Sequence, residues 1–528
     1  MAVQPIFSRK SHTVPNVVES RYGQTVAVSS GHPLASQAAA DTYAKSGNIV
    51  DAAIVGAGVL GTLLPYACGI GGDAYLLYYD ARSRKVHALN GTGAAPSGAT
   101  PDQFSGGMPG TGIHSCTVPG AVALWDDALK QFGTMSLGSA LAPAIRYARE
   151  GFPVHVGLIE NIEKKHELIR RDPEASRQFL SETPLVIGQP FRQTDLARVL
   201  ETIAEYGAQE FYCGALAGEV VGKLIDAGGL FALDDFNRHK TLAQSPIRTS
   251  FYGHEILTMP PNSVGLHLLL QLRALQAAEI ENVDTNSVAF WRATIAAWRY
   301  SLDVSRTAIG DPRDAVVEAE ALLNAESISS RVASSVGLPL PAPQSGDTSN
   351  LVVMDAAGNA VSLVQSVSAP FASGIVLPGT GIVMNNRMRG FDNVSGSINR
   401  VGPGRRPKHT LVPALVLREG RAVMSIGTPG AAGQPLTLAQ VLARIIAHGQ
   451  DPAEAVKAPR WSVGLNNEII VERYAPSEVV RALRLDENDL DVMSERHVRF
   501  GSVKIVMSGA EGLHAVADYR RVAGIATK

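Results

Sequence analysis

The sequence lacks any strong excess of charge of one sign. Its 528 residues include 47 Lys and Arg against 49 Asp and Glu, a formal net charge of −2. Binding to nucleic acid or to an anionic membrane surface needs an excess of clustered positive charge. We therefore expect neither partner, whereas small neutral or anionic ligands stay open.

Cysteine is scarce as well. The three cysteines, Cys68, Cys116 and Cys213, are odd in number and widely spaced, with no C-x-x-C pair. This pattern excludes a disulfide framework and a cysteine-based zinc site, and indicates buried thiols in a reducing compartment. No other cluster has metal-ligand spacing, so we expect no metal and no cofactor.

Long hydrophobic runs are also missing. The first 22 residues contain no apolar stretch typical of a secretory signal. The longest apolar segment, residues 49–67, contains Asp51, several glycines and Pro65, which favours a buried helix over a membrane span. A cytoplasmic protein is the expectation.

The remaining pattern predicts helices early and strands late. Helices are expected at 32–45, 48–64, 120–132, 137–150, 193–206 and 436–448, and strands at 74–79, 86–89, 351–355, 360–366, 414–417, 423–426, 468–471, 503–507 and 514–517. The part after residue 347 is small and would open with unpaired edges if it folded alone. We therefore expect strands from both parts to join one core.

The junction at Asp347–Thr348 separates a proline-rich linker, with Pro339, Pro341 and Pro343, from an apolar strand pattern. Prolines favour an extended, exposed path. If the chain were cut there, Thr348 would carry a hydroxyl beside a free α-amine with a pKa of roughly 7.7–8.0. That combination is a nucleophile with its own base. Spacing alone favours a simpler reading, a threonine that only begins a strand.

Two glycine-rich segments have alternative explanations. Residues 427–433 lie between a strand and a helix, where backbone N–H groups can form an oxyanion hole or merely cap the helix. Gly56, Gly58 and Gly61 match G-x-G-x-x-G, with Asp80 about twenty residues later, which leaves an NAD-dependent oxidoreductase as an alternative. The competing explanation is close packing of two elements. A further cluster, residues 69–72, is typical of a tight turn beneath a site.

Stretches spread over nearly the whole chain resemble the γ-glutamyltranspeptidase-like N-terminal-nucleophile hydrolases. They are residues 47–53, 118–120, 132–135, 228–235, 259–261, 310–312 and 381–386. The resemblance implies a four-layer αββα sandwich formed jointly by two chains cut from one precursor. Residues 1–347 would be the large chain and 348–528 the small chain, associated as a heterodimer that could itself pair.

The resemblance also implies roles for individual residues. Thr348 corresponds to the nucleophile, Ser366 to a residue whose hydroxyl contacts it, and Gly430 and Ala431 to the pair whose amides form the oxyanion hole. An alanine keeps the N–H group provided that the backbone needs no positive φ. The Asp347–Thr348 bond would be cut by the Thr348 hydroxyl itself.

Departures from the family pattern concern the substrate. The segment 91–96 lacks the arginine that would bind an α-carboxylate, and Gly390 replaces the aspartate that would pair with an α-ammonium. Arg387 and Arg389 add positive charge, and His409 and Thr410 replace paired serines. With Ser368, these four residues are the expected substrate contacts.

Arginines favour an anion and reject an ammonium group. The charge pattern therefore predicts hydrolysis of a small carboxylate-bearing amide, with oxamate, cut to oxalate and ammonia, as the best candidate. The alternatives are a γ-glutamyl transferase or hydrolase, a cephalosporin-type acylase, and a binding protein that is never cut.

Overall fold

The computed structural model describes residues 17–180, 183–323, 328–335, 337, 338, 340, 346–464, 466–486, 489–494 and 497–528. The linker prolines Pro339, Pro341 and Pro343 lie outside this described part. No helix in these ranges is both long and apolar enough to cross a bilayer.

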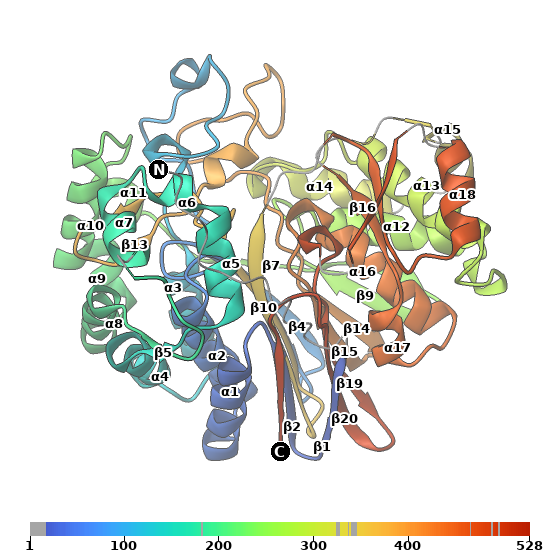
Figure 1. Cartoon of the computed structure of the whole chain (residues 1–528), viewed down its shortest axis with the longest axis horizontal. Coiled ribbons are helices and arrows are strands. Elements are labelled where there is room, and N and C mark those ends of the chain that lie inside the picture. The colour runs from blue at the N-terminus through green and yellow to red at the C-terminus, as the bar shows by residue number, and fades with distance from the viewer. Residues whose placement is uncertain are drawn as a thin grey trace.

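Two seven-stranded sheets pack face to face at the centre of the molecule (Figure 1). The first sheet has the order β21 (Gly524–Thr527), β2 (Val26–Ser30), β10 (Asp347–Asp355), β11 (Ala360–Ser368), β3 (Asp73–Asp80), β4 (Lys85–Gly91), β7 (Leu242–Gln244). The second has the order β1 (Glu19–Gly23), β20 (Gly512–Ala517), β19 (Lys504–Gly509), β15 (Arg421–Gly427), β14 (Ala414–Arg418), β9 (His254–Thr258), β8 (Ile247–Phe251). Neighbouring strands are antiparallel throughout both sheets.

Helices cover the outer face of each sheet (Figure 1). Those beside the first sheet are α1 (Pro33–Ser46), α2 (Ile49–Leu63), α3 (Ala121–Phe132), α4 (Leu137–Glu150), α5 (Val156–Lys164), α6 (His166–Ile169), α7 (Pro173–Phe179), α8 (Thr194–Tyr206), α9 (Ala208–Cys213), α10 (Ala215–Asp226) and α11 (Leu233–Asn237). Those beside the second are α12 (Gly265–Ala277), α13 (Val288–Val304), α14 (Pro312–Leu323), α15 (Ile328–Ser335), α16 (Gln434–Leu442), α17 (Pro452–Lys457) and α18 (Ser477–Asp486). The expected αββα sandwich, built from both parts of the chain, is confirmed.

The predicted elements are found with small shifts at their ends. The helix expected at 436–448 is α16 followed by a π-helical segment, Ala443–Ala447. The strand expected at 468–471 is β17 (Ile469–Glu472), which joins β16 (Trp461–Val463) and β18 (Leu490–Met493) in a separate small sheet. Cys68 and Cys116 are buried as expected, but Cys213 is exposed because it ends the short surface helix α9.

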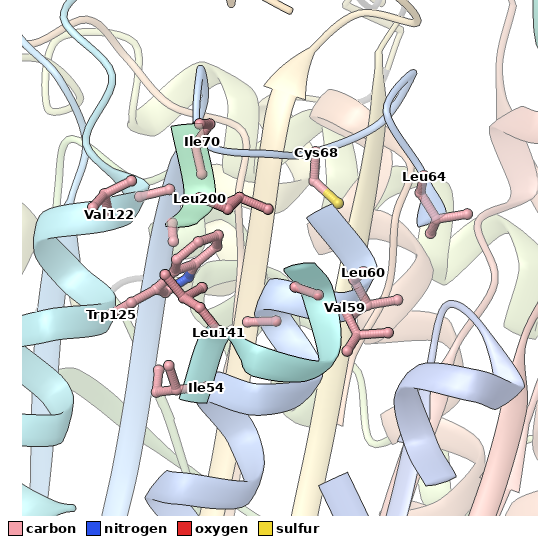
Figure 2. Packing of buried hydrophobic residues seen from close by; sticks show 14 of the residues in the cluster. Ile54, Val59, Leu60, Leu64, Cys68, Ile70, Val122, Trp125, Leu141 and Leu200 are labelled. Atoms are coloured by element: carbon pink, nitrogen blue, oxygen red, sulfur yellow. The ribbon is translucent and has the colours of Figure 1, made fainter. Parts of the chain in front are cut away.

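Strand β10 is buried on both faces. Its side chains alternate, as in any strand: Leu351 and Val353 pack into the core under α2, whereas Val352 and Met354 pack between the two sheets. Figure 2 shows the helical side of this core, with Leu60 of α2 among the labelled apolar side chains. The strand is therefore enclosed by protein on every side.

The glycines of the G-x-G-x-x-G match lie inside α2, not at the start of a helix. A side chain at Gly56 would place its Cβ 2.3 Å from Leu351 Cδ1 of β10. A phosphate group needs the free N–H groups of a helix N-terminus, and the middle of a helix has none to offer. The nucleotide-binding alternative is thus contradicted, and close packing explains the motif.

The turn at residues 69–72 lies directly beneath the end of β11. A Cβ at Gly72 would lie 2.5 Å from the carbonyl oxygen of Ser366, and one at Gly71 would lie 2.2 Å from that of Val383. Only glycine lets these backbones approach so closely. This confirms the tight turn expected from the sequence.

We expect Gly72→Ala to lower the free energy of unfolding by about 1–3 kcal/mol, because the added methyl group meets rigid backbone. Chemical denaturation of the purified protein measures this change. Gly218→Ala in α10 is the control, because a Cβ there meets nothing within 4 Å. Equal denaturation midpoints for the two variants would contradict the proposed packing role.

Candidate active site

Thr348 lies near the start of β10, between β2 and β11 in the first sheet. It is 5% exposed, and the pairing with β11 is irregular between Asp347 and Ser349. The junction that the sequence singles out therefore lies at the buried start of a core strand.

Side chains hold this peptide group on both of its ends. The Ser366 hydroxyl donates a hydrogen bond of 2.6 Å to the carbonyl oxygen of Asp347. The Thr348 N–H donates to Asp347 Oδ1 at 2.8 Å, and the Arg521 guanidinium binds the same carboxylate oxygen. Ser366 thus contacts the carbonyl that the Thr348 hydroxyl would attack.

The glycine-rich loop 427–433 leads from β15 into α16, beside Thr348. Gly430 has φ 141° and Ala431 has φ 51°, so the backbone at the alanine does adopt the left-handed region. An alanine there costs about 1–2 kcal/mol, which shows that the surrounding structure imposes this geometry. At the start of α16, Gln434 Nε2 lies 3.4 Å from Thr348 Oγ1 and donates to it. Gly346 packs against Ala431.

A small pocket, here called the cationic pocket, adjoins these groups. It is lined by Gly346, Ser368, Arg387, Arg389, Gly390, Lys408, Thr410 and Ala431, with a free volume of about 10 Å³. The structure thus brings together Ser368, Arg387, Arg389 and Thr410, which the sequence predicts as substrate contacts. No acidic side chain lines the pocket, so it suits an anion.

Asp73 lies behind the cationic pocket and binds two predicted site residues. Its Oδ2 is 3.4 Å from Arg387 Nε and 3.1 Å from His409 Nε2. Arg387 Nη1 donates to Thr410 Oγ1 at 3.3 Å, and its Nη2 has no partner among the described residues. One edge of the buried guanidinium is thus held, and another is available to a ligand.

Burial controls the charges of this cluster. It lowers the pKa of Arg387 to about 10, with Asp73 acting in the opposite direction, so the guanidinium stays charged at neutral pH. Burial and the charge of Arg387 lower the pKa of His409 to about 4. The imidazole is therefore neutral and fully enclosed, and it supports Asp73 rather than facing the pocket.

A second, larger cavity also reaches Thr348. Its volume is about 490 Å³, and its walls include Tyr66, Asp347, Lys504 and Arg521 besides Thr348. Thr348 therefore lines the larger cavity of mixed charge, whereas its neighbours Gly346 and Ala431 line the small cationic pocket.

Sequence reasoning missed four residues of this site: Asp73, Gln434, Lys504 and Arg521. Lys504 carried a usable signal, since it is a lysine within an otherwise apolar strand pattern, Val503 to Met507. The other three lie far from their partners in the sequence and only the fold brings them together. Within the described ranges, no group of three or more His, Cys, Asp or Glu could hold a metal ion.

Comparisons with known proteins found relatives that match along nearly the whole chain. The γ-glutamyltranspeptidase family model matches residues 35–527. The glutathione hydrolase-like YwrD proenzyme of Bacillus subtilis is 34% identical over 516 residues, covering 95% of this chain and 98% of the relative. The oxamate amidohydrolase proenzyme of Klebsiella pneumoniae is 30% identical, covering 94% and 96%. A crystal structure of cephalosporin acylase from Bacillus halodurans matches with a TM-score of 0.91 at 30% identity, over 99% of each chain.

The fold and the family match define an N-terminal-nucleophile hydrolase, a class that cleaves amide and peptide bonds. The chain belongs to the γ-glutamyltranspeptidase family.

Replacing Asp73 by Asn should lower the free energy of unfolding by about 3–5 kcal/mol, because it leaves the buried charge of Arg387 without its counter-charge. Denaturant titration followed by circular dichroism measures the loss. Asp226→Asn, at the exposed end of α10, removes the same charge without this consequence. A shift no larger than that of the control would show that Asp73 does not stabilise the buried arginine.

Proposed function

We propose that this protein is a self-processing amidohydrolase with Thr348 as its nucleophile. The observation that carries the proposal is the position of the Asp347–Thr348 peptide, held by Ser366 and Arg521 beside the cationic pocket. Cleavage there would give chains of residues 1–347 and 348–528 and would free the α-amine of Thr348. The relatives described as proenzymes support this order of events.

In turnover, the Thr348 hydroxyl attacks the substrate amide while the α-amine accepts the proton and returns it to the leaving nitrogen. Gly430 and Ala431 present backbone N–H groups to the oxyanion, next to the start of α16. Gln434 holds the hydroxyl oxygen. Cleavage would free Gly346 to move away from Ala431, which would enlarge the cationic pocket beyond its one-water volume.

The charges around the pocket select the substrate class. An α-ammonium would meet Arg387, Arg389 and Lys408 with no facing carboxylate, which disfavours a γ-glutamyl donor. A carboxylate would instead accept hydrogen bonds from Arg387 Nη2. A small amide bearing a carboxylate fits, and oxamate, hydrolysed to oxalate and ammonia, is the proposed substrate.

A cephalosporin-type acylase is the second candidate. The 490 Å³ cavity beside Thr348 is larger than a small amide needs, and the acylase of Bacillus halodurans shares the fold along its whole length. Release of the side-chain acid from glutaryl-cephalosporin, without release of ammonia from oxamate, would favour this candidate.

Thr348→Ala should abolish both cleavage and ammonia release, because no other group can supply the attacking hydroxyl and the α-amine. Intact mass and N-terminal sequencing should find fragments in the wild type, one of them beginning Thr348-Ser349-Asn350, and only the 528-residue chain in the variant. Ser349→Ala is the matched control, since its buried hydroxyl has no hydrogen-bond partner in the described part of the chain. An uncut wild-type chain would refute the proposal.

For the substrate, Arg387→Gln should lower kcat/KM for oxamate by about 10- to 100-fold, the loss expected for one charged hydrogen bond. Oxamide has the same skeleton without the carboxylate, so kcat/KM for oxamide should fall much less. Arg418→Gln, at the exposed end of β14, should change neither value. Equal losses for oxamate and oxamide would show that Arg387 does not read the carboxylate.

A further inference from the structure

Self-cleavage needs a base that turnover does not. Until the chain is cut, the nitrogen of Thr348 is an amide and cannot accept the hydroxyl proton. Another group must take this proton before the hydroxyl attacks. The following inference rests on the proposed cleavage at Asp347–Thr348.

Lys504 lies near Thr348, in the sheet that faces β10. It is the first residue of β19, paired with Gly427 of β15 and Ala517 of β20, in the sheet that packs against β10. Its side chain is buried, and it lines the 490 Å³ cavity together with Asp347 and Thr348. Lys504 and Thr348 thus line the same cavity.

The partners of Lys504 are neutral. Its Nζ donates to the carbonyl oxygen and to the hydroxyl of Ser502, at 2.8 Å each. No carboxylate among the described residues forms an ion pair with it. A buried lysine without an anionic partner is costly to keep charged.

Charged side chains act on the pKa of Lys504 in both directions. Burial is the main cause that lowers the pKa of Lys504, to about 7; Asp518 and Asp347 raise it, whereas Arg521 and Arg460 lower it. A large fraction of the amine is therefore neutral near pH 7 and able to accept a proton.

We propose that Lys504 is the general base of self-cleavage, taking the hydroxyl proton of Thr348 across the shared cavity. Thr348 Oγ1 forms a bond to the carbonyl carbon of Asp347, and the oxyanion accepts the hydrogen bond from Ser366. The C–N bond then breaks, and the Lys504 ammonium returns its proton to the departing nitrogen. The resulting ester between Asp347 and Thr348 Oγ1 is hydrolysed by water, which leaves a carboxylate on Asp347 and restores the hydroxyl.

The carboxylate of Asp347 is the competing base. Its Oδ1 already accepts hydrogen bonds from the Thr348 N–H and from Arg521. These two donors use both lone pairs of this oxygen, so it has none left for the Thr348 hydroxyl proton. Arg521 and Asp347 are therefore positioning residues, which hold the peptide group in the attack geometry.

The test follows full-length chains made by cell-free synthesis, pulse-labelled and sampled over time on denaturing gels. Lys504→Met should slow cleavage by about 10²- to 10⁴-fold, and Lys504→Arg by a similar factor, because arginine keeps the charge but does not give up a proton. Small external amines should restore part of the rate in Lys504→Met. Asp347→Asn should still cleave with the wild-type pH dependence.

The wild-type rate should rise with pH through about 7 and then level off, since deprotonation of Lys504 creates the active form, and Lys504→Met should lose this rise. Thermal melting of Thr348→Ala, with and without Lys504→Met, compares folding in two uncut chains. A wild-type cleavage rate in Lys504→Met or in Lys504→Arg would overturn the role of Lys504 but leave the proposed function standing. An uncut wild-type chain would overturn the proposed function as well.

Discussion

The enclosure of β10 is the constraint on which the rest of the structure depends. Its two neighbours fix its backbone, and apolar layers fix both of its faces. The Asp347–Thr348 peptide stands where this rigid strand begins, so its position is set by the whole core rather than by a loop. Rigid placement of reacting groups is a large part of the rate that an enzyme gains.

The charged groups of the cationic pocket lie in two layers, with Arg387 at the pocket and Asp73 behind it. Asp73 is buried behind Arg387, and its negative charge offsets part of the free energy that it costs to bury the guanidinium. The other edge of the guanidinium stays available to a ligand. A carboxylate lining the pocket itself would compete with an anionic substrate. Placed one layer deeper, the same carboxylate orients the arginine without closing the site, which is the usual role of groups that support a binding side chain.

Much of the fold could be read from the sequence, because period-two runs such as 351–355 and Ala-rich helices such as 49–63 are strong local signals. The glycine pattern around Gly56 occurs both in phosphate-binding loops and where two elements pack closely. Only its position, at the start of a helix or inside one, distinguishes the two cases. Of the site, Thr348, Arg387 and Thr410 could be predicted. Asp73 and Arg521 could not, because their partners lie far away in the sequence and no local pattern links them.

The strand order has a consequence for the association of the two parts of the chain. In the first sheet, β21, β11 and nearly all of β10 come from the part after residue 347. From the part before it, β2 lies between β21 and β10, and β3 pairs with β11. After a cut at Thr348, the two chains could not separate without breaking the ladders of both sheets. Their dissociation would be the same event as global unfolding, so dilution alone would not separate them.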